Sequence, residues 1–257
     1  MCYYMETIYY DDPLFKEVDA TYIIHLESDT KRYADIREQL TLYHPTRTVH
    51  IVYNKGFKRC EKPNVSTTVE DLVDVCAYVM KDAQKYNTIL LLEDDFMFNP
   101  RIREHTKNID EFVSTHSQFI YRLGCLPSIQ VPYNRYTYVG LSLGTHAVLL
   151  SKSIREKLMR PPRMDWDLYL NFASPNFMYY MPLCYQLFPQ TENQKNWGKD
   201  GAVSAMVAPI VIWFIKTVRL DQQVSPGYPL MYAASKLAPL VLLGVACFTG
   251  SGRGGGR

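Results

Sequence analysis

The sequence predicts an α/β fold, with a mostly parallel central sheet flanked by helices, on the strength of two observations. Short apolar segments rich in Ile, Val and Leu occupy residues 20–26, 48–53 and 88–92, and this composition is typical of buried strands. The segments between them carry apolar residues at helical spacing. Strand, helix and strand therefore alternate twice, as they do in consecutive β-α-β units.

The two intervening helices have recognisable ends. The first places Tyr33, Ile36 and Leu40 on one face and ends before Pro45, since the residue preceding a proline avoids helical geometry. The second begins at a Thr-x-x-Glu capping box, residues 67–70. Its apolar face consists of Val69, Leu72, Val73, Cys76, Met80 and Ala83. Both helices are amphipathic, as helices that cover one face of a sheet are expected to be.

Three regions are predicted along the chain. Residues 1–19 are tyrosine-rich and acidic and are interpreted as an irregular N-terminal lead-in. Residues 20–200 form the α/β domain, and residues 201–257 form an apolar, basic C-terminal segment that is helical. Further strands of the domain are expected at residues 119–123, 136–150 and 181–188.

Composition excludes some classes of function. The 257 residues carry a formal net charge of +2, so no global basic field favours nucleic acid as a partner. The six cysteines are scattered, without the spacing of a zinc site, and are predicted to be free thiols in a reducing compartment. The first residues lack the pattern of a secretory signal. The expected location is the cytoplasm, or the cytoplasmic side of a membrane.

Three consecutive carboxylates, Glu93, Asp94 and Asp95, follow the apolar segment at residues 88–92. In an open α/β sheet, ligands bind at the carboxyl ends of the strands. Like charges at this spacing repel each other, and a divalent cation on carboxylate oxygens is the simplest counter-charge. The alternative is a strand that stops at a solvated acidic turn. The context favours a metal site at these three acids.

A nucleotide site is predicted beside these acids. His25, Leu26 and Glu27 end the first apolar segment and precede a helix, whose first backbone N–H groups attract phosphate. Arg32 lies at the start of that helix and is a candidate for phosphate or ribose binding, together with Asp94. The alternatives are a solvated helix residue for Arg32 and a hydrogen-bonded structural histidine for His25.

Asp165 and Asp167 are the candidates for catalysis. They stand one residue apart where a loop enters a helix, and a carboxylate there accepts the proton of a sugar hydroxyl. Helix capping by Asp165 is an equally good interpretation and requires no catalysis. Trp166, between them, either stacks on a sugar ring or fills the core.

The C-terminal segment contains two uncharged runs, residues 202–215 and 237–252, each interrupted by a proline. Both are shorter than a helix that spans a bilayer. Core helices, a re-entrant hairpin and interfacial segments fit them equally well. From Lys195 onward there are seven Lys or Arg and two Asp or Glu, which favours contact with an anionic membrane surface. The hypothesis is that residues 201–257 attach the protein to a membrane and are dispensable for its chemistry.

Several segments together resemble a known family. They are residues 22–26 with Arg32, residues 89–96, residues 144–151, residues 165–167, and Tyr185-Gln186. In this order they resemble glycosyltransferase family 25, the lipooligosaccharide and collagen galactosyltransferase type, and its relatives in large DNA viruses. The resemblance covers residues 20–198, and the Leu-Glu-Asp-Asp element is its most specific part.

The resemblance implies a GT-A fold, in which an acidic motif follows a central strand of a nucleotide-binding sheet. It implies that Asp95, with Glu93 or Asp94, holds Mn²⁺ or Mg²⁺ against the diphosphate of a UDP-sugar. The chain departs from the family in two places. His25-Leu26 replaces Asn-Leu, and residues 64–68 stand where the family has Gly-Cys-x-x-Ser-His.

We therefore expect a metal-dependent glycosyltransferase that transfers a hexose from a nucleotide sugar to a glycan or protein acceptor with inversion. One alternative is a sugar-phosphate nucleotidyltransferase, although the Glu27–Arg32 segment lacks the glycines of its phosphate loop. The other is a non-catalytic, membrane-attached relative with a structural or scaffold role.

Overall fold

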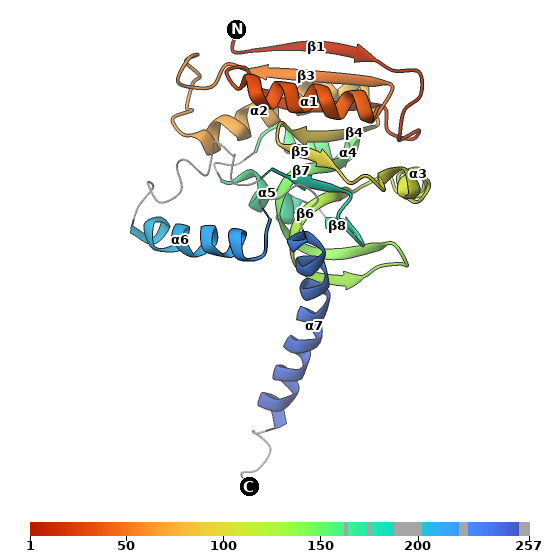
Figure 1. Ribbon diagram of the computed structural model, residues 1–257, viewed down its shortest axis with the longest axis vertical. Coiled ribbons are helices and arrows are strands. Elements are labelled where there is room, and N and C mark those ends of the chain that lie inside the picture. Colours follow the sequence, from red (N-terminus) through yellow and green to blue (C-terminus); the bar gives the residue numbers. More distant parts are fainter. Residues whose placement is uncertain (162–163, 174–175, 188–201, 221–225, 252–257) are drawn as a thin grey trace.

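The computed structural model describes residues 1–161, 164–173, 176–187, 202–220 and 226–251 (Figure 1). Its main sheet is made of β1 (Tyr3–Tyr9), β2 (Ala20–Leu26), β3 (Thr48–Asn54), β4 (Thr88–Glu93), β6 (Ile120–Pro132), β7 (Thr137–Ser151) and β8 (Asn176–Tyr179). A second, two-stranded sheet pairs β5 (Phe96–Phe98) with β9 (Cys184–Gln186). The α-helices are α1 (Thr30–Leu42), α2 (Thr68–Asp82), α3 (Thr106–Thr115), α4 (Lys152–Leu158), α5 (Trp166–Ala173), α6 (Ala202–Thr217) and α7 (Gly227–Ser251). Two 3₁₀ turns, η1 (Ala83–Lys85) and η2 (Ile102–His105), complete these elements.

The α/β class is confirmed, and the main sheet is mixed. Its strand order is β1-β3-β2-β4-β7-β6-β8. The predicted parallel arrangement holds in the β3-β2-β4 part and for β6 with β8, whereas β7 runs antiparallel to β4, β6 and β8. The carboxyl ends of β2 and β4 therefore lie side by side, which places the acidic motif next to the start of α1.

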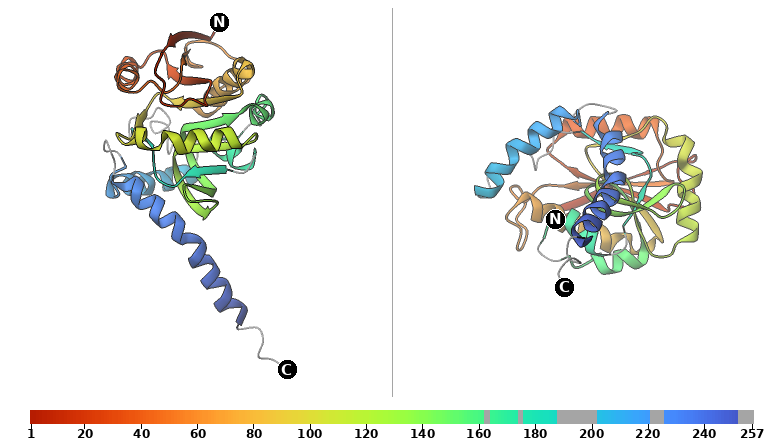
Figure 2. Two further views of the ribbon diagram at one scale, coloured as in Figure 1. Left: turned by 90° about the vertical axis from the view of Figure 1, so that its right-hand side faces the viewer. Right: turned by 90° about the horizontal axis from the view of Figure 1, so that it is seen from below.

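Helices cover both faces of the sheet (Figures 1 and 2). Strand β4 explains this arrangement, because its alternate residues belong to two different cores. Leu90 and Leu92 pack with α1 and α3, whereas Ile89 and Leu91 pack with α2, α4 and α5. A strand buried on both faces needs a continuous apolar run, and this requirement accounts for the composition of residues 88–92. The capping box that begins α2 is also confirmed, with Thr67 and Glu70 bonded reciprocally.

The prediction of an irregular lead-in is wrong for residues 3–9. They form β1, which pairs antiparallel with β3 along its whole length, from Tyr3 opposite Asn54 to Tyr9 opposite Thr48. The strand lies at the edge of the sheet and has no fully buried residue. Its side chains are tyrosine and polar rather than aliphatic, so it lacks the apolar run by which the interior strands were predicted.

The prediction that all six cysteines are free thiols is also wrong. Cys2, just before β1, and Cys60, in the loop after β3, form a disulfide with a Cα–Cα distance of 5.6 Å. Cys76, Cys125 and Cys184 are free and buried. The side chain of Cys247 is not among those that the structure describes, so the prediction stands untested there. The disulfide joins two segments that are 58 residues apart in the chain, which spacing in the sequence does not reveal.

The C-terminal segment forms α6 and α7, which lie at the opposite end of the molecule from β1 (Figure 1). Each helix continues through the proline in its interior, Pro209 or Pro239. Within the described residues, none of the helices combines the length and the hydropathy that crossing a membrane requires. The first turns of α7 pack on the sheet, because Tyr228 and Tyr232 are buried there.

Candidate functional site

Asp94 is held by the ends of two other elements. Its Oδ2 accepts hydrogen bonds from the backbone N–H of Leu26 at 3.0 Å and from Nδ1 of His25 at 3.2 Å, and its Oδ1 forms an ion pair with Arg32. Since an ionised carboxylate only accepts, His25 donates from Nδ1. Burial opposes ionisation of Asp94, but the bond from His25 and the charge of Arg32 outweigh it and hold the pKa below its ordinary value.

Asp95 is equally buried but less well satisfied. Its Oδ2 accepts from Nε2 of Gln186 at 3.1 Å and lies 3.5 Å from Nη2 of Arg32. Its Oδ1 is buried and has no hydrogen-bond partner. Burial raises the pKa of Asp95 to about 6, with a further contribution from the charge of Asp94 and against the opposing effect of Arg32. A buried carboxylate oxygen without a partner is costly for the folded state, and it marks this side chain as a candidate ligand.

The counter-charge predicted for the acidic motif is supplied in part by the protein itself. The guanidinium of Arg32 contacts both Asp94 and Asp95 and is itself buried. Asp29 caps the N-terminus of α1 by accepting a hydrogen bond from the backbone N–H of Arg32 at 3.1 Å. This bond fixes the backbone from which the Arg32 side chain extends. Arg32 therefore positions the acidic motif, to which the two predicted metal ligands, Glu93 and Asp95, belong.

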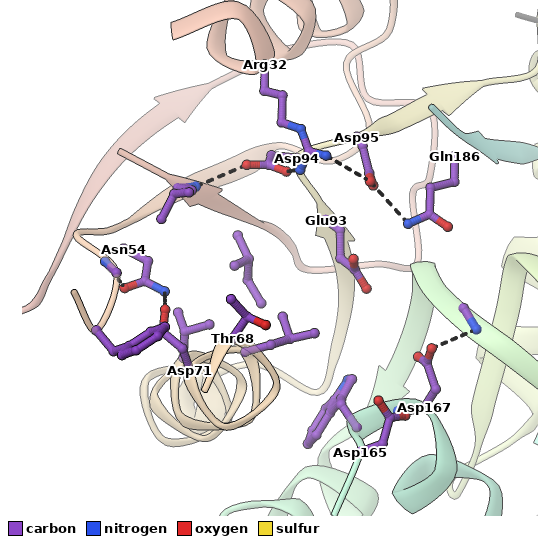
Figure 3. Close-up of a pocket in the computed structure, with 18 of the residues that line it drawn as sticks. Arg32, Asn54, Thr68, Asp71, Glu93, Asp94, Asp95, Asp165, Asp167 and Gln186 are labelled. Carbon is purple, nitrogen blue, oxygen red and sulfur yellow. Dashed lines mark hydrogen bonds and ion pairs between the residues drawn. The ribbon is translucent and has the colours of Figure 1, made fainter. Parts of the chain in front are cut away.

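A cavity of about 890 Å³ lies in front of these acids. Its lining includes Glu93, Asp94 and Asp95 from the end of β4, and Asp165 and Asp167 from the start of α5. Figure 3 shows Glu93 directed into the space between the two groups. The structure thus brings together the two acidic motifs that the sequence separates by about 70 residues, and the predicted metal and catalytic residues share one cavity.

Asp165 and Asp167 have different surroundings. Oδ1 of Asp165 accepts from the backbone N–H of Asp167 at 3.0 Å and from that of Leu168 at 3.2 Å, so this residue caps α5. Oδ2 of Asp167 accepts from the backbone N–H of Gly144 at 2.9 Å. Gly144 has a φ of 79°, a conformation that favours glycine. Trp166 is buried in the core against α2 and α4.

The wall of the cavity opposite these acids is built by the end of β3 and the loop after it. Asn54 donates from Nδ2 to Asp71 at 2.9 Å, and its Oδ1 accepts from the backbone N–H of Gly56 at 2.9 Å. Lys62 is buried against the same pair, donating to Oδ1 of Asn54 at 2.7 Å. The loop between Asn54 and Lys62 lines the cavity with three basic side chains, Lys55, Lys58 and Arg59. A cavity with acids on one wall and bases on the other is suited to a phosphorylated ligand.

The third wall comes from the C-terminal segment. Phe214 and Ile215 of α6 line the cavity, as does Leu220. Tyr228 of α7 accepts a hydrogen bond at 3.1 Å from the backbone N–H of Gln186, the residue whose side chain holds Asp95. Helix α6 and the first turns of α7 are therefore part of the cavity wall and its support, and the dispensability of residues 201–257 for the chemistry stays a prediction to be tested.

Two residues predicted for the nucleotide site are placed elsewhere. His25 is buried behind Asp94, and the side chain of Glu27 accepts from the hydroxyl of Tyr4 at 2.8 Å; neither is among the residues that line the cavity. Leu26 and Arg32 do line it. The presence of Asn54, Asp71, Gln186 and the basic loop at the cavity was not predicted from the sequence. The run of basic residues immediately after the second strand was an available signal for this loop.

The residues present fit a divalent cation that takes only one or two ligands from the protein. No group of three or more His, Cys, Asp or Glu suited to a metal occurs among the residues that the structure describes. Glu93 and Asp95 are two carboxylates at the cavity, and Oδ1 of Asp95 has no partner. Mg²⁺ is characteristically held by one or two carboxylates, with substrate phosphates and water completing its shell. A cation held by these two carboxylates would take the rest of its ligands from substrate phosphates and water.

Comparison with known proteins gives distant structural likenesses. No model of a protein family matches the chain, and no curated protein matches it. Similar solved structures include a glycosyltransferase involved in the glycosylation of the major capsid of PBCV-1, with 14% identity and a TM-score of 0.34 over 55% of this chain and 63% of that chain. They also include A197 from STIV, with 11% identity and a TM-score of 0.39 over 63% of this chain and 80% of that one.

A third similar structure is the mannose-1-phosphate geranyltransferase from Thermus thermophilus, with 11% identity and a TM-score of 0.38 over 63% of this chain and 73% of that one. The present chain spans less than two thirds of the length of the PBCV-1 glycosyltransferase, 63%. Likenesses at these identities assign no activity.

Proposed function

We propose that the protein is a metal-dependent glycosyltransferase that transfers a hexose from a nucleotide sugar, a UDP-sugar by expectation, to a glycan or protein acceptor. One observation carries the proposal. A single cavity joins a buried carboxylate with an unpartnered oxygen, a basic loop on the opposite wall, and a second acidic motif at the start of α5. The resemblance of the chain to glycosyltransferase family 25 supports the same reaction.

The donor diphosphate is assigned to the space between the acids and the basic loop. Glu93 and Asp95 would hold Mn²⁺ or Mg²⁺, whose chemistry is to neutralise the charge on a departing nucleoside diphosphate. Lys58 and Arg59 are exposed side chains at the rim and supply further positive charge to the phosphates. Arg32 and Asp94 also line the cavity, and their mutual ion pair sets the position of the acidic motif.

Asp167 is the better candidate for the base. Direct displacement with inversion needs one carboxylate that accepts the proton of the acceptor hydroxyl. The bond from the backbone N–H of Gly144 fixes the Asp167 carboxylate at the cavity, whereas Asp165 serves as the cap of α5. A positioned carboxylate retains the orientation that proton transfer requires, so Asp167 takes the role of general base in this proposal.

The two alternatives predict different chemistry. A sugar-phosphate nucleotidyltransferase joins a nucleoside triphosphate to a sugar phosphate and releases pyrophosphate. A non-catalytic scaffold relative retains the fold and neither binds nor cleaves a nucleotide sugar. The turn between β2 and α1, Glu27-Ser28-Asp29, contains no glycine and is too short for a phosphate loop, which argues against the nucleotidyltransferase.

The proposal is tested by thermal stabilisation with a panel of nucleotide sugars, with and without Mn²⁺, followed by hydrolysis of the best ligand. A ligand that binds only the folded state stabilises it by about 2.7 kcal/mol at a hundred times its Kd. Asp95→Asn removes the charge and keeps the shape, so metal-dependent donor binding is expected to fall at least about tenfold while the protein stays folded. Asp12→Asn, at an exposed position outside the cavity, is the matched control.

Two results would contradict this assignment. Unchanged Mn²⁺-dependent donor binding in folded Asp95→Asn protein removes Asp95 from the metal site. Failure of every nucleotide sugar to stabilise or to be hydrolysed, under conditions where the protein is folded, favours the scaffold alternative over any transferase.

A further inference from the structure

Helix α7 consists of two halves with opposite surroundings. Its first turns are part of the folded body, because Tyr228 and Tyr232 are buried there. Ser235 donates from Oγ to Oε1 of Gln130 at 3.0 Å, and Lys236 donates from Nζ to the carbonyl oxygen of Tyr180 at 2.6 Å. Beyond Lys236 the helix leaves the body and projects away from it (Figures 1 and 2).

The projecting half is apolar on every side. Leu240, Val241, Leu242 and Leu243 are four consecutive residues, and each is between 57% and 65% exposed. Successive residues of an α-helix are turned by about 100°, so four in a row point in directions that together encircle the helix. A protein groove or a second helix covers one stripe, whose residues recur every three or four positions. An apolar medium that surrounds the helix buries all four of these side chains at once.

The charges around these helices identify the kind of medium. Residues 202–251 contain one acidic residue, Asp221, and three basic ones, Lys216, Arg219 and Lys236. Lys216 and Arg219 are exposed at and just after the end of α6. In the sequence, Arg253 and Arg257 follow α7. Basic residues next to an apolar helix are attracted to the anionic headgroups of a bilayer. The combination therefore fits an anionic membrane better than it fits a neutral apolar surface.

Helix α6 connects this surface to the cavity. Trp213 is 65% exposed, and the neighbouring Phe214 is partly exposed and lines the cavity. Both helices lie at the same end of the molecule, with α6 lying across it and α7 leading away (Figure 1). Tryptophan is enriched at the level of the headgroups, where its ring is partly apolar and partly hydrated. A membrane that takes up the projecting half of α7 would thus meet α6 and the edge of the cavity as well.

We propose that residues 237–251 of α7 insert into one leaflet of an anionic bilayer, with α6 at the level of the headgroups, so that the cavity opens beside the membrane surface. The inserted part is about 22 Å long at 1.5 Å per residue, less than the hydrocarbon core of about 30 Å. The protein is attached from one side, as amphipathic and partly inserted helices attach other proteins. This attachment does not depend on the reaction assigned to the cavity.

Co-flotation of the full chain with vesicles tests the proposal. Binding is measured to vesicles of phosphatidylcholine with phosphatidylglycerol, and to vesicles of phosphatidylcholine alone, at low and at high salt. The Leu240→Glu/Leu242→Glu variant places two charges in the proposed inserted half, at exposed positions where the fold tolerates them. Leu42→Glu and Tyr9→Glu are controls, because both residues are exposed on elements away from the C-terminal helices.

The double variant is expected to lose at least about tenfold in binding to the anionic vesicles, since each charge opposes insertion. The control variants are expected to bind like the parent, and high salt and neutral vesicles to weaken binding. Circular dichroism and hydrolysis of a nucleotide sugar in solution report independently that the variant is folded and that its cavity is intact.

Three results would overturn the proposal. The first would be a parent protein that does not float with anionic vesicles, and the second a double variant that floats as well as the parent. Alternatively, sedimentation velocity without lipid shows self-association that the double variant abolishes, in which case a second copy of the chain covers the helix. Equal binding to neutral and anionic vesicles, insensitive to salt, overturns the anionic part of the proposal.

Discussion

At the scale of single residues, Asp94 and Asp95 show how neighbouring carboxylates acquire different roles. Both are buried at the end of β4 and both contact Arg32. His25 and the backbone of Leu26 complete the hydrogen bonding of Asp94, and its pKa is held below the ordinary value. Asp95 lacks such donors on Oδ1, and burial raises its pKa to about 6. Environments that separate two carboxylates in this way are typical of functional sites.

Substitution of the two aspartates at the start of α5 distinguishes a base from a cap. Asp167→Asn is expected to lower turnover by about 10²–10⁴ and to leave donor affinity nearly intact, because the amide cannot accept the acceptor's proton. Asp165→Asn is expected to retain both activity and stability, because asparagine caps a helix about as well as aspartate. Steady-state transfer rates and donor titrations measure both effects. Equal turnover in the parent and both variants places the base elsewhere.

His146 makes stability depend on pH in a defined window. It is buried on β7, where its Nε2 donates to the carbonyl oxygen of Cys184 at 3.2 Å, and burial lowers its pKa to about 3. Between about pH 6.5 and 3 the unfolded chain binds a proton at this residue and the folded chain does not. The free energy of unfolding therefore falls as pH decreases through this window, and the contribution of His146 is fully retained only above about pH 6.5.

Because of His146, we expect the free energy of unfolding to be lower by about 2 kcal/mol at about pH 5 than at pH 7. His146→Gln retains a donor for Cys184 and does not titrate, so its stability should decrease less over the same interval. Urea denaturation of both proteins at the two pH values gives the comparison. A parallel decrease in both would show that His146 is not responsible.

At the scale of elements, the disulfide connects β1 to the basic loop of the cavity. Cys60 directly follows Arg59, and the carbonyl oxygen of Cys2 accepts from the backbone N–H of Lys55 at 3.2 Å. Gly56, between these residues, has a φ of 75° and donates its backbone N–H to Asn54. The loop is thus fixed at its start by a turn and at its end by a covalent bond. Its three basic side chains are presented to the cavity from a restrained backbone.

Removal of the disulfide is expected to lower both stability and donor affinity. The bond joins residues 58 positions apart, for which chain entropy predicts a contribution of about 4 kcal/mol to the free energy of unfolding. The Cys2→Ser/Cys60→Ser variant should show this loss and a raised donor Kd, because the basic loop is less restrained. The parent protein in reductant is the matched comparison and should behave like the variant. A variant as stable as the oxidised parent would show that the bond does not form.

At the scale of the whole molecule, the cavity is completed by the C-terminal segment, which follows the last strand of the sheet in the sequence. Phe214 and Ile215 form one wall, and Tyr228 supports Gln186, which in turn holds Asp95. The C-terminal helices therefore have two roles in the fold. Helix α6 and the first turns of α7 close the site, and the remainder of α7 projects from it (Figure 1).

Two truncations separate these roles. A chain ending at Lys199 exposes the surfaces that α6 and α7 cover, at about 25 cal/mol per Å² of apolar area. Since a domain is stable by only about 5–15 kcal/mol, this chain is expected to be insoluble or molten and to bind no donor. A chain ending at Lys236 keeps Tyr228, Tyr232 and Ser235 and should unfold cooperatively and bind donor like the parent. Circular dichroism and donor titration provide the measurement, and a stable, active chain ending at Lys199 contradicts the expectation.

Much of the α/β core was predictable from local patterns. The strands at residues 20–26 and 88–92 and the Thr67–Glu70 capping box are confirmed, because buried strands and helix ends depend on residues only a few positions apart. The acidic motif was also correctly placed at the end of a central strand. Strand β1 was missed because an edge strand tolerates tyrosine and polar residues, so its sequence lacks a distinctive pattern.

The sequence by itself therefore determined the α/β class, the two β-α-β units and the position of the acids at the end of β4. Only the tertiary structure decided which residues complete the site. Gln186 reaches Asp95 from 91 positions away, and the disulfide joins residues 58 apart. Such contacts depend on how the whole sheet is ordered, since no periodicity of the chain relates residues at those distances. Local spacing specifies elements, whereas long-range packing specifies the cavity between them.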